Sequence, residues 1–415
     1  MSKLIDLTIE GIAAGGRGLG FYNGKSIFVP YTIPGERARV LITHSGDRHA
    51  DAEGVDLLEA SADRVYPLCP HFGPGRCRGC QWQHITADVH ALLKTDILAD
   101  QLARLGGLTD SEIEHVLRPA IAAPAMWGYN RHLTLSVTAD GRLGLPSTDN
   151  GQIIPIDVCP ITHPDVLALR DQLDLDLTGI RRVRLELGSD DAAMILLSIV
   201  TEEDAPELEA DFPASVNLLL PDNEPMNLIG DSHTRYQVSG RWFRVTAGGF
   251  FRPNVDALSG LVDVVVRLLD ARAHEAVLDL YAGAGLFGAF VADTAALVTL
   301  VESYPPTATD ADDNTAAYAH VEVIEGSVEA VLPELEEHYD AAIVDPPSSG
   351  MSEQAVVALV EASPGRIIYI SGDPASLARD VKRLRSAGYA LTDAQPIDLA
   401  PQTYYLETVA RFEKM

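Results

Sequence analysis

The sequence predicts an α/β protein with a small N-terminal β-barrel, a central α/β domain that carries a cysteine-rich loop, and a C-terminal Rossmann-like domain. Three observations support this. Short apolar runs alternate with glycine-rich turns over residues 3–57. Strand-like runs mix with polar turns over residues 127–240, and from about residue 241 strand, loop and helix patterns follow one another in turn. We expect domains at 1–58, 59–240 and 241–415.

The N-terminal segment has the pattern of a small antiparallel barrel. Its apolar runs read LIDLTIEGI, SIFVPYTI and RARVLITHS, and the turns between them read AAGGRGLG, YNGK and PGE. Barrels of this kind often bind oligonucleotides. After the cysteine loop, HALLKTDILADQLARLGG has a helical period and a glycine stop, which predicts a helix over residues 90–105.

Composition limits the possible functions. The 415 residues include 60 acidic and 31 basic side chains, for a formal charge of −29. Such a charge should repel nucleic acid unless the basic residues are segregated. No apolar run approaches the roughly 18 residues that cross a membrane, and the first residues, MSKLIDLTIEGIAAGG, lack a signal-peptide pattern. We expect a cytoplasmic monomer without a membrane contact.

The cysteines suggest a metal site. Cys69, Cys77 and Cys80 follow C-x7-C-x2-C spacing in a loop rich in glycine and proline, and Cys159 lies 79 positions after Cys80. Three clustered thiols and a remote fourth, without an export signal, fit a metal site better than disulfides. Zinc and an iron-sulfur cluster both accept four thiolates, so the spacing leaves the metal open. Unrelated buried cysteines are the alternative.

A nucleotide site is expected where VLDLYAGAGLFG turns from strand to helix. Gly283, Gly285 and Gly288 would let the backbone approach a ligand closely. Asp279 precedes this turn, and Glu302 ends the next strand, where a carboxylate can bind a ribose. NAD and S-adenosylmethionine both fit these features.

The D-P-P loop at Asp345-Pro-Pro-Ser-Ser-Gly350 distinguishes between NAD and S-adenosylmethionine as the expected cofactor. It resembles the substrate-side loop of class I methyltransferases that act on nucleic acids, which favours S-adenosylmethionine. The alternative is that Asp345 only caps a turn before a helix.

Taken together, these features resemble the uridine-C5 RNA methyltransferase family over nearly the whole chain. Residues 3–57 are similar to its RNA-binding TRAM domain. The cysteines, with Gln83-His84 after them and Pro160-Ile161 after the fourth, resemble the family's cluster pattern. The resemblance implies a 4Fe-4S cluster rather than zinc, and rRNA or tRNA as partner. The implied cluster ligands are Cys69, Cys77, Cys80 and Cys159.

Two further motifs carry the resemblance. Trp127-Gly-Tyr-Asn130 is similar to the family's W-G-Y-R-N, and Pro401-Gln-Thr-Tyr-Tyr-Leu-Glu-Thr408 to its P-Q-T-x-H-x-E-T, whose glutamate is the base. This implies Glu407 as the base, with Tyr405 where the family usually has histidine. The implied cofactor-binding residues are Arg252, Asp279, Tyr281, Gly283, Gly285, Glu302 and Asp345.

The residues that differ from the family's motifs lie on the side of the site that would hold the nucleobase. In the family a cysteine thiolate adds to uracil C6, which makes C5 nucleophilic, and a carboxylate later removes the C5 proton. That cysteine belongs to an S-C-N-P or S-C-D-P loop, which is Ser371-Gly372-Asp373-Pro374 here. Arg252 stands where the family has glutamine, and Ser348 where it has arginine. Ser371 is a weak substitute, because a hydroxyl needs a dedicated base.

Three hypotheses follow. The protein is an RNA methyltransferase with another target atom, such as a nitrogen whose lone pair needs no thiol. Alternatively, it is a non-catalytic RNA-binding protein that kept the scaffold. A nicotinamide oxidoreductase also fits the glycine turn, but D-P-P and the cysteines disfavour it. The resemblance implies 5-methyluridine formation, and Gly372 argues against it.

Overall fold

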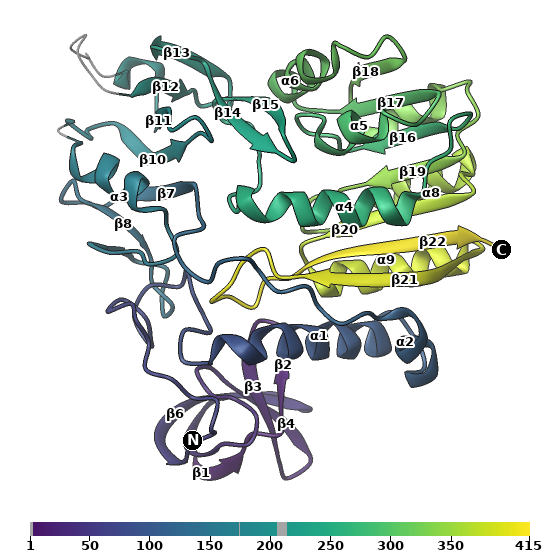
Figure 1. Cartoon of the computed structure of the whole chain (residues 1–415). Coiled ribbons are helices and arrows are strands. Elements are labelled where there is room, and N and C mark those ends of the chain that lie inside the picture. The colour runs from purple at the N-terminus through teal and green to yellow at the C-terminus, as the bar shows by residue number, and fades with distance from the viewer. Residues whose placement is uncertain (1–2, 174, 206–213) are drawn as a thin grey trace.

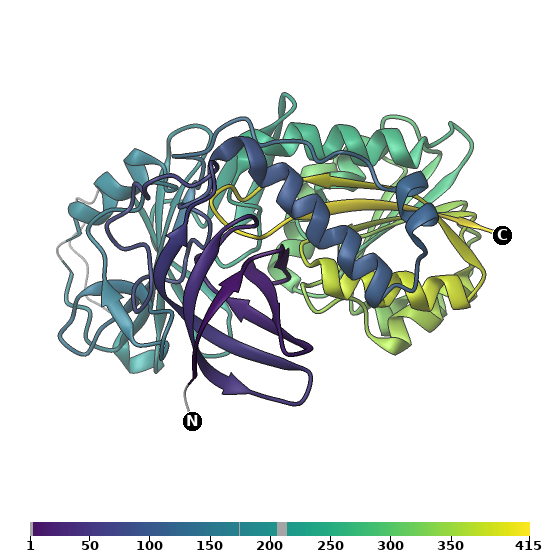
Figure 2. The same ribbon diagram turned by 90° about the horizontal axis from the view of Figure 1, so that it is seen from below.

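The computed structural model describes residues 3–173, 175–205 and 214–415 (Figure 1). An N-terminal sheet, a central sheet and a C-terminal α/β part succeed one another along the chain. Helix α1 (Ala87–Arg104) runs between the N-terminal sheet and the C-terminal part (Figure 2). This is the architecture that the sequence predicts.

The N-terminal sheet has six strands in the order β1-β5-β6-β4-β3-β2. Buried and exposed residues alternate along β1, which places Ile5 and Leu7 inside. Asn23 and Gly24, both with positive φ, make the two-residue turn between β3 and β4. The expected antiparallel pairing is wrong at one place, because β4 and β6 pair in parallel. The strands are β1 (Lys3–Thr8), β2 (Gly11–Ala13), β3 (Arg17–Tyr22), β4 (Lys25–Val29), β5 (Arg37–Ser45) and β6 (His49–Glu59).

The expected helix after the cysteine loop is present as α1. It ends before Gly106 and Gly107, and Gly107 has φ +71°. A second helix, α2 (Asp110–Val116), follows with a capping box between Thr109 and Glu112. Both helices pack on the C-terminal sheet rather than on the central one. The domain limits drawn from the sequence remain predictions.

The central sheet has seven strands in the order β13-β12-β11-β10-β7-β8-β9, with only β11 and β12 parallel among the described pairs. Helix α3 (Pro164–Asp171) packs against β10. A hairpin of β14 (His233–Val238) and β15 (Arg241–Thr246) leads to the C-terminal part. The sheet strands are β7 (His132–Val137), β8 (Leu143–Pro146), β9 (Ile153–Pro155), β10 (Ile180–Leu187), β11 (Ala193–Ile199), β12 (Ser215–Leu219) and β13 (Pro225–Ile229).

The C-terminal sheet has the order β18-β17-β16-β19-β20-β22-β21. Its first five strands are parallel as expected, whereas β22 runs antiparallel to β20 and β21. The strands are β16 (Ala276–Leu280), β17 (Leu297–Glu302), β18 (Val321–Glu325), β19 (Ala341–Val344), β20 (Arg366–Ser371), β21 (Tyr389–Ile397) and β22 (Glu407–Lys414).

Helices cover both faces of this sheet, as the apolar strands predict. Val277 packs in the core of one face, and Leu278 and Leu280 in the core of the other, because neighbouring strand residues point to opposite sides. The first face carries α4 (Leu258–Leu269), α5 (Leu286–Val291) and α6 (Pro305–Thr315); the second carries α7 (Val328–Val331), α8 (Glu353–Ala362) and α9 (Pro374–Ser386), with α1 and α2.

A search of the described residues finds no helix with the length and apolar character that crossing a membrane requires.

Candidate active site at the strand ends

The glycine turn follows β16 directly. Tyr281, Gly283 and Gly285 have φ of +60°, +54° and +78°, and glycine suits such positions because it lacks a Cβ. Gly288 has another reason to be small, since a Cβ there would lie 2.8 Å from Leu300. The turn therefore needs the glycines that the sequence singled out, two for their backbone conformation and one for close packing on β17.

Glu302, the last residue of β17, points to this turn. Its Oε2 accepts a hydrogen bond from the Gly283 N–H at 2.8 Å, and its Oε1 accepts one from the Tyr304 N–H at 2.7 Å. The adjacent parallel strands thus bring Glu302 and the glycine turn together, as predicted. A Cβ at Gly283 would have no heavy atom within 4 Å, so the turn borders open space.

Asp279 is the buried acid of this region. Its Oδ2 accepts a hydrogen bond from the Gly288 N–H at 2.8 Å, while Oδ1 has no partner among the described residues. Burial raises the pKa of Asp279 to about 8, and the nearby Asp345 and Glu302 add to the increase. The carboxyl group is therefore mostly protonated at neutral pH.

Arg252 joins two of the predicted site residues into one cluster, which we call the ion triad. Its guanidinium contacts both carboxylate oxygens of Asp345, at 2.8 and 2.9 Å, and Oε1 of Glu407 at 2.7 Å. The three side chains are only 12 to 16% exposed.

The two carboxylates keep Arg252 charged. Burial alone would lower the pKa of Arg252, but Asp345 and Glu407 outweigh it and raise that pKa above its usual value. Burial raises the pKa of Asp345, and Arg252 opposes this. Sequence reasoning named all three residues but missed their pairing. The sequence did contain a signal for this pairing: Arg252 stands where the family has glutamine, in a site that already includes the carboxylates Asp345 and Glu407.

Gly372 lies beside the ion triad. It follows β20, and a Cβ built on it would lie 3.7 Å from Glu407 Oε2, an ordinary contact distance. Ser371 is committed elsewhere, because its hydroxyl donates to the Asp373 carbonyl at 3.0 Å and accepts from the Asp373 N–H at 3.2 Å. Asp373 also caps α9 by accepting from the Ser376 N–H.

Aromatic side chains stand next to the ion triad. The Phe250 ring is 6.0 Å from Arg252 Cζ and 65% exposed, and Tyr405 is half exposed two residues before Glu407. Ser348 is exposed on the D-P-P loop. The sequence motifs contained Phe250 and Tyr405, but only the structure reveals that they remain solvent-accessible.

The cysteine loop is held by local hydrogen bonds. The Gln83 side chain accepts from the Cys69 N–H at 3.0 Å, and the Gly79 N–H donates to Cys77 Sγ at 3.3 Å. Burial raises the pKa of Cys80 to about 12, and the other three cysteines add to this, so all four lie within electrostatic range of one another.

The thiols do not form a metal-binding group by geometry. Within the described parts of the chain, no three Cys, His, Asp or Glu side chains are arranged to hold a metal ion. Proximity and coordination geometry therefore disagree at this loop. Proximity alone does not make a metal site, because the ligand atoms must also converge on one point.

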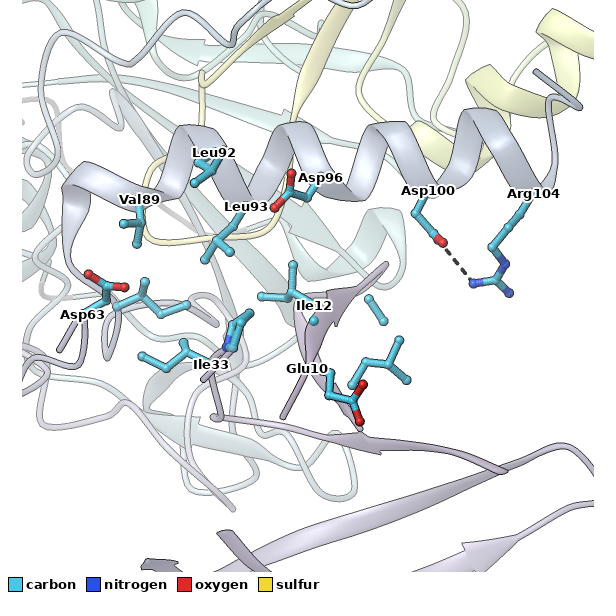
Figure 3. A pocket seen from close by; sticks show the side chains of 15 residues that line it. Glu10, Ile12, Ile33, Asp63, Val89, Leu92, Leu93, Asp96, Asp100 and Arg104 are labelled. Atoms are coloured by element: carbon cyan, nitrogen blue, oxygen red, sulfur yellow. Dashed lines mark hydrogen bonds and ion pairs between the residues drawn. The ribbon is translucent and has the colours of Figure 1, made fainter. Parts of the chain in front are cut away.

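A cavity of about 430 Å³ lies between the N-terminal sheet and α1, away from the ion triad (Figure 3). Most of its lining residues are apolar, and of its charged ones Glu10, Asp63, Asp96 and Asp100 are acidic and only Arg104 is basic, which disfavours an RNA contact there. Perturbed ionisable groups gather at the strand ends instead, so we place the candidate site there. The labelled cavity residues are Glu10, Ile12, Ile33, Asp63, Val89, Leu92, Leu93, Asp96, Asp100 and Arg104.

Comparisons with known proteins extend over the whole chain. A protein described as an uncharacterized RNA methyltransferase of Streptomyces avermitilis is 34% identical, with 100% of this chain and 99% of the relative covered. The 23S rRNA (uracil(1939)-C(5))-methyltransferase of Shewanella sediminis is 30% identical, with 100% and 96% covered. No protein-family model matches the chain.

One solved structure has the same fold throughout. The Pyrococcus abyssi tRNA (uracil-54, C5)-methyltransferase, crystallised with S-adenosyl-L-homocysteine, superposes with a TM-score of 0.74 over 99% of this chain and 100% of its own. The two sequences are 21% identical, so this likeness concerns the fold. It confirms the predicted α/β class with its Rossmann-like C-terminal part.

Proposed function

The chain belongs to the uridine-C5 family of RNA methyltransferases, and on that premise we propose that it binds S-adenosylmethionine and RNA without forming 5-methyluridine by the covalent route. One observation carries this proposal. The residue next to the Glu407 carboxylate is Gly372, which has no side chain to attack uracil C6. Ser371 does not replace a thiol, because its hydroxyl is bonded to the backbone of Asp373.

We propose that the glycine turn and Glu302 bind the cofactor. Glu302 suits a ribose because it is already oriented by two backbone N–H groups, and the space beside Gly283 is open. S-adenosylmethionine would supply an electrophilic methyl group there. The other proposed cofactor-binding residues are Arg252, Asp279, Tyr281, Gly285 and Asp345.

The proposed target is an atom with its own lone pair, such as a nitrogen of a base in rRNA or tRNA. Such an atom needs neither a thiol nor removal of a proton from carbon. That chemistry does not need Glu407 as a base for a carbon-bound proton, and Oε1 of Glu407 is already bonded to Arg252 at 2.7 Å. The exposed Phe250 ring offers a target nucleobase an aromatic surface for stacking. Ser348 on the D-P-P loop cannot provide one.

A non-catalytic RNA-binding protein is the second candidate. The same ion triad favours it, because Arg252 already satisfies both oxygens of Asp345 and one of Glu407. In this reading the triad is a structural replacement for a lost catalytic group. A site that must exchange hydrogen bonds with a substrate would have to open these contacts first.

The 4Fe-4S cluster on Cys69, Cys77, Cys80 and Cys159 remains a proposal. The spacing of the four cysteines and the N–H that Gly79 donates to Cys77 Sγ support it, whereas the described residues do not bring three of the thiols into an arrangement that holds a metal ion. Iron and sulfide analysis of anaerobically purified protein tests it. Four iron atoms per chain would support the cluster, and iron-free folded protein would exclude it.

Calorimetric titration with S-adenosylmethionine tests the proposed function first. We expect binding by the wild type and at least tenfold weaker binding by Glu302→Gln, because an amide presents a donor where a carboxylate accepts. Asp140→Asn, on an exposed turn of the central domain, is the control. Wild-type protein that binds no ligand at millimolar concentration would exclude both enzyme hypotheses.

Methyl transfer then separates the two remaining candidates. Total rRNA and tRNA from a strain lacking the gene are incubated with the protein and labelled S-adenosylmethionine. Label in a nucleoside other than 5-methyluridine would support the altered-target enzyme. RNA binding without any label would support the non-catalytic reading.

A further inference from the structure

The segment between β21 and β22, residues 398–406, leads into Glu407 and is held mainly from outside the sheet. In Figure 1 it is the yellow loop that extends from the sheet toward the blue and teal parts. The Gln402 carbonyl accepts hydrogen bonds from the N–H groups of Gln81 and Trp82, at 3.1 and 3.0 Å. The cysteine loop is thereby bonded directly to this segment.

Two more contacts come from other parts of the chain. The Tyr129 hydroxyl donates to the Pro401 carbonyl at 2.8 Å, and the Asn254 side chain donates to the Leu399 carbonyl at 2.9 Å. Gln402 itself has φ +67°, an unfavourable conformation for a residue with a side chain, so the surroundings must maintain it.

The strongest contact comes from Lys94 on α1. Its ammonium group contacts Asp398 Oδ1 at 2.6 Å and the Ala400 carbonyl at 3.0 Å. The Lys94 side chain is 0% exposed and that of Asp398 is 3% exposed. The partners lie 304 positions apart, so the pair ties α1 to the segment before Glu407.

An ion pair at this depth is an inefficient way to stabilise a fold. Removing two charges from water costs several kcal/mol, and apolar residues of similar volume often stabilise as well or better. Burial lowers the pKa of Lys94, and Asp398 counteracts this. What the pair adds over apolar packing is a fixed geometry, because Lys94 reaches one carboxylate and one carbonyl of the same segment.

We propose that Lys94 is a positioning residue whose buried ion pair with Asp398 fixes the segment that delivers the Glu407 carboxylate to the ion triad. The functional importance of this positioning rests on the proposed function, in which the Glu407 carboxylate borders position 372 of the site. The structural effect is independent of it and is measured without turnover. In the described part of the chain Lys94 has no hydrogen bond or ion pair with the triad or the glycine turn. Its hydrogen bonds go to Asp398 and Ala400, and its ammonium group lies 5.8 Å from the centre of the Trp82 ring.

Hydrogen exchange measured by mass spectrometry tests the proposal on the full chain. Lys94→Met removes the charge and keeps the length of the side chain. We expect backbone amides of residues 399–407 to exchange at least tenfold faster in this variant. Exchange at the wild-type rate would overturn the proposal.

A double variant separates positioning from general stability. Lys94→Met with Asp398→Leu leaves no unpaired buried charge, so we expect its urea midpoint to recover most of the loss seen in Lys94→Met. Fast exchange of residues 402–407 should persist, because neither new side chain reaches the segment's polar groups. Ala400 is left out of this comparison, because its N–H donates to Asp398 Oδ1 at 3.1 Å and loses that acceptor in the double variant. If the double variant restores slow exchange, the pair is only a stability element and the proposal is wrong.

Arg366→Met is the matched control. Arg366 pairs with Glu275 at 16% and 10% exposure, at the start of β20 and thus at the opposite end of that strand from Ser371. We expect it to lower the urea midpoint without changing exchange in residues 399–407. Equal acceleration there by Arg366→Met would overturn the proposal.

A second readout reports on Glu407 directly. In a Gly372→Cys background the introduced thiol lies next to Glu407, so its alkylation rate against pH depends on that carboxylate. We expect Lys94→Met to shift this profile and Arg366→Met to leave it unchanged. An unshifted profile in Lys94→Met would overturn the proposal. Loss of cofactor binding would contradict the proposed function alone.

Discussion

Gly372 and Glu407 face each other at the carboxyl end of the C-terminal sheet, where a Cβ on Gly372 would lie 3.7 Å from Glu407 Oε2. Gly372 directly follows β20, and Glu407 is the first residue of β22. These two strands pair antiparallel, with Ser371 opposite Thr408, so the contact follows from the register. A group at position 372 would therefore act beside the carboxylate that the resemblance makes the base. Under the proposed function, position 372 is where the covalent route would need a thiol, and glycine has no side chain to supply one.

Gly372→Cys should fold normally and regain covalent reactivity. The new side chain meets ordinary contact distances, so we expect the free energy of unfolding to change by less than about 1 kcal/mol. With S-adenosylmethionine and 5-fluorouridine-substituted RNA, the thiol adds to C6 and fluorine blocks release, which gives an adduct stable to denaturation. The wild type and Gly372→Ala should give none.

The adduct is detected as a shifted band on a denaturing gel. A well-folded Gly372→Cys protein without an adduct, even after Arg252→Gln and Ser348→Arg are added, would mean that more than the missing thiol separates this chain from covalent catalysis.

Arg252→Gln should destabilise the protein strongly. The variant leaves the charges of Asp345 and Glu407 close together without a counter-ion, and breaking such a buried pair costs about 3–5 kcal/mol. Adding Glu407→Gln should recover part of this loss. Urea denaturation measures both, with Arg272→Gln in an exposed pair as the control, for which we expect no more than about 1 kcal/mol. Wild-type stability in Arg252→Gln would refute the structural importance of the triad.

Asp279 should make stability depend on pH in a defined direction. Burial raises the pKa of Asp279 in the folded protein from its ordinary value of 3.8 to about 8, so between these pH values the folded state holds the extra proton. The free energy of unfolding should therefore fall as pH rises from 4 to 8, by at most about 1.4 kcal/mol per pH unit from this group.

Asp279→Asn isolates this contribution, because the amide resembles the protonated acid. Denaturation curves at several pH values should show the wild type losing stability relative to the variant up to about pH 8 and no further. Parallel curves for the two proteins would show that Asp279 titrates near its ordinary pKa.

Local patterns in the sequence predict much of this molecule. Alternating apolar residues predict the N-terminal sheet, and the glycine turn with Glu302 predicts the meeting of β16 and β17, because adjacent parallel strands end at one edge. The parallel pairing of β4 with β6 was missed, since pairing between distant strands is set by how the sheet curls rather than by local pattern.

Local sequence patterns do not predict polar contacts between residues that are far apart in the chain. Arg252 lies 93 positions from Asp345 and 155 from Glu407, and Lys94 lies 304 from Asp398. One signal was available for Lys94. Lys94 lies on the same buried face of α1 as Leu93, Ile97 and Leu98. A lysine at a buried position requires a buried partner for its charge.

The amount of 5-methyluridine in rRNA and tRNA from cells with and without the gene, measured by liquid chromatography and mass spectrometry, tests whether the covalent route is lost. Because position 372 holds glycine, we expect equal amounts in both strains. A 5-methyluridine that disappears on deletion and returns with the wild-type gene would contradict it.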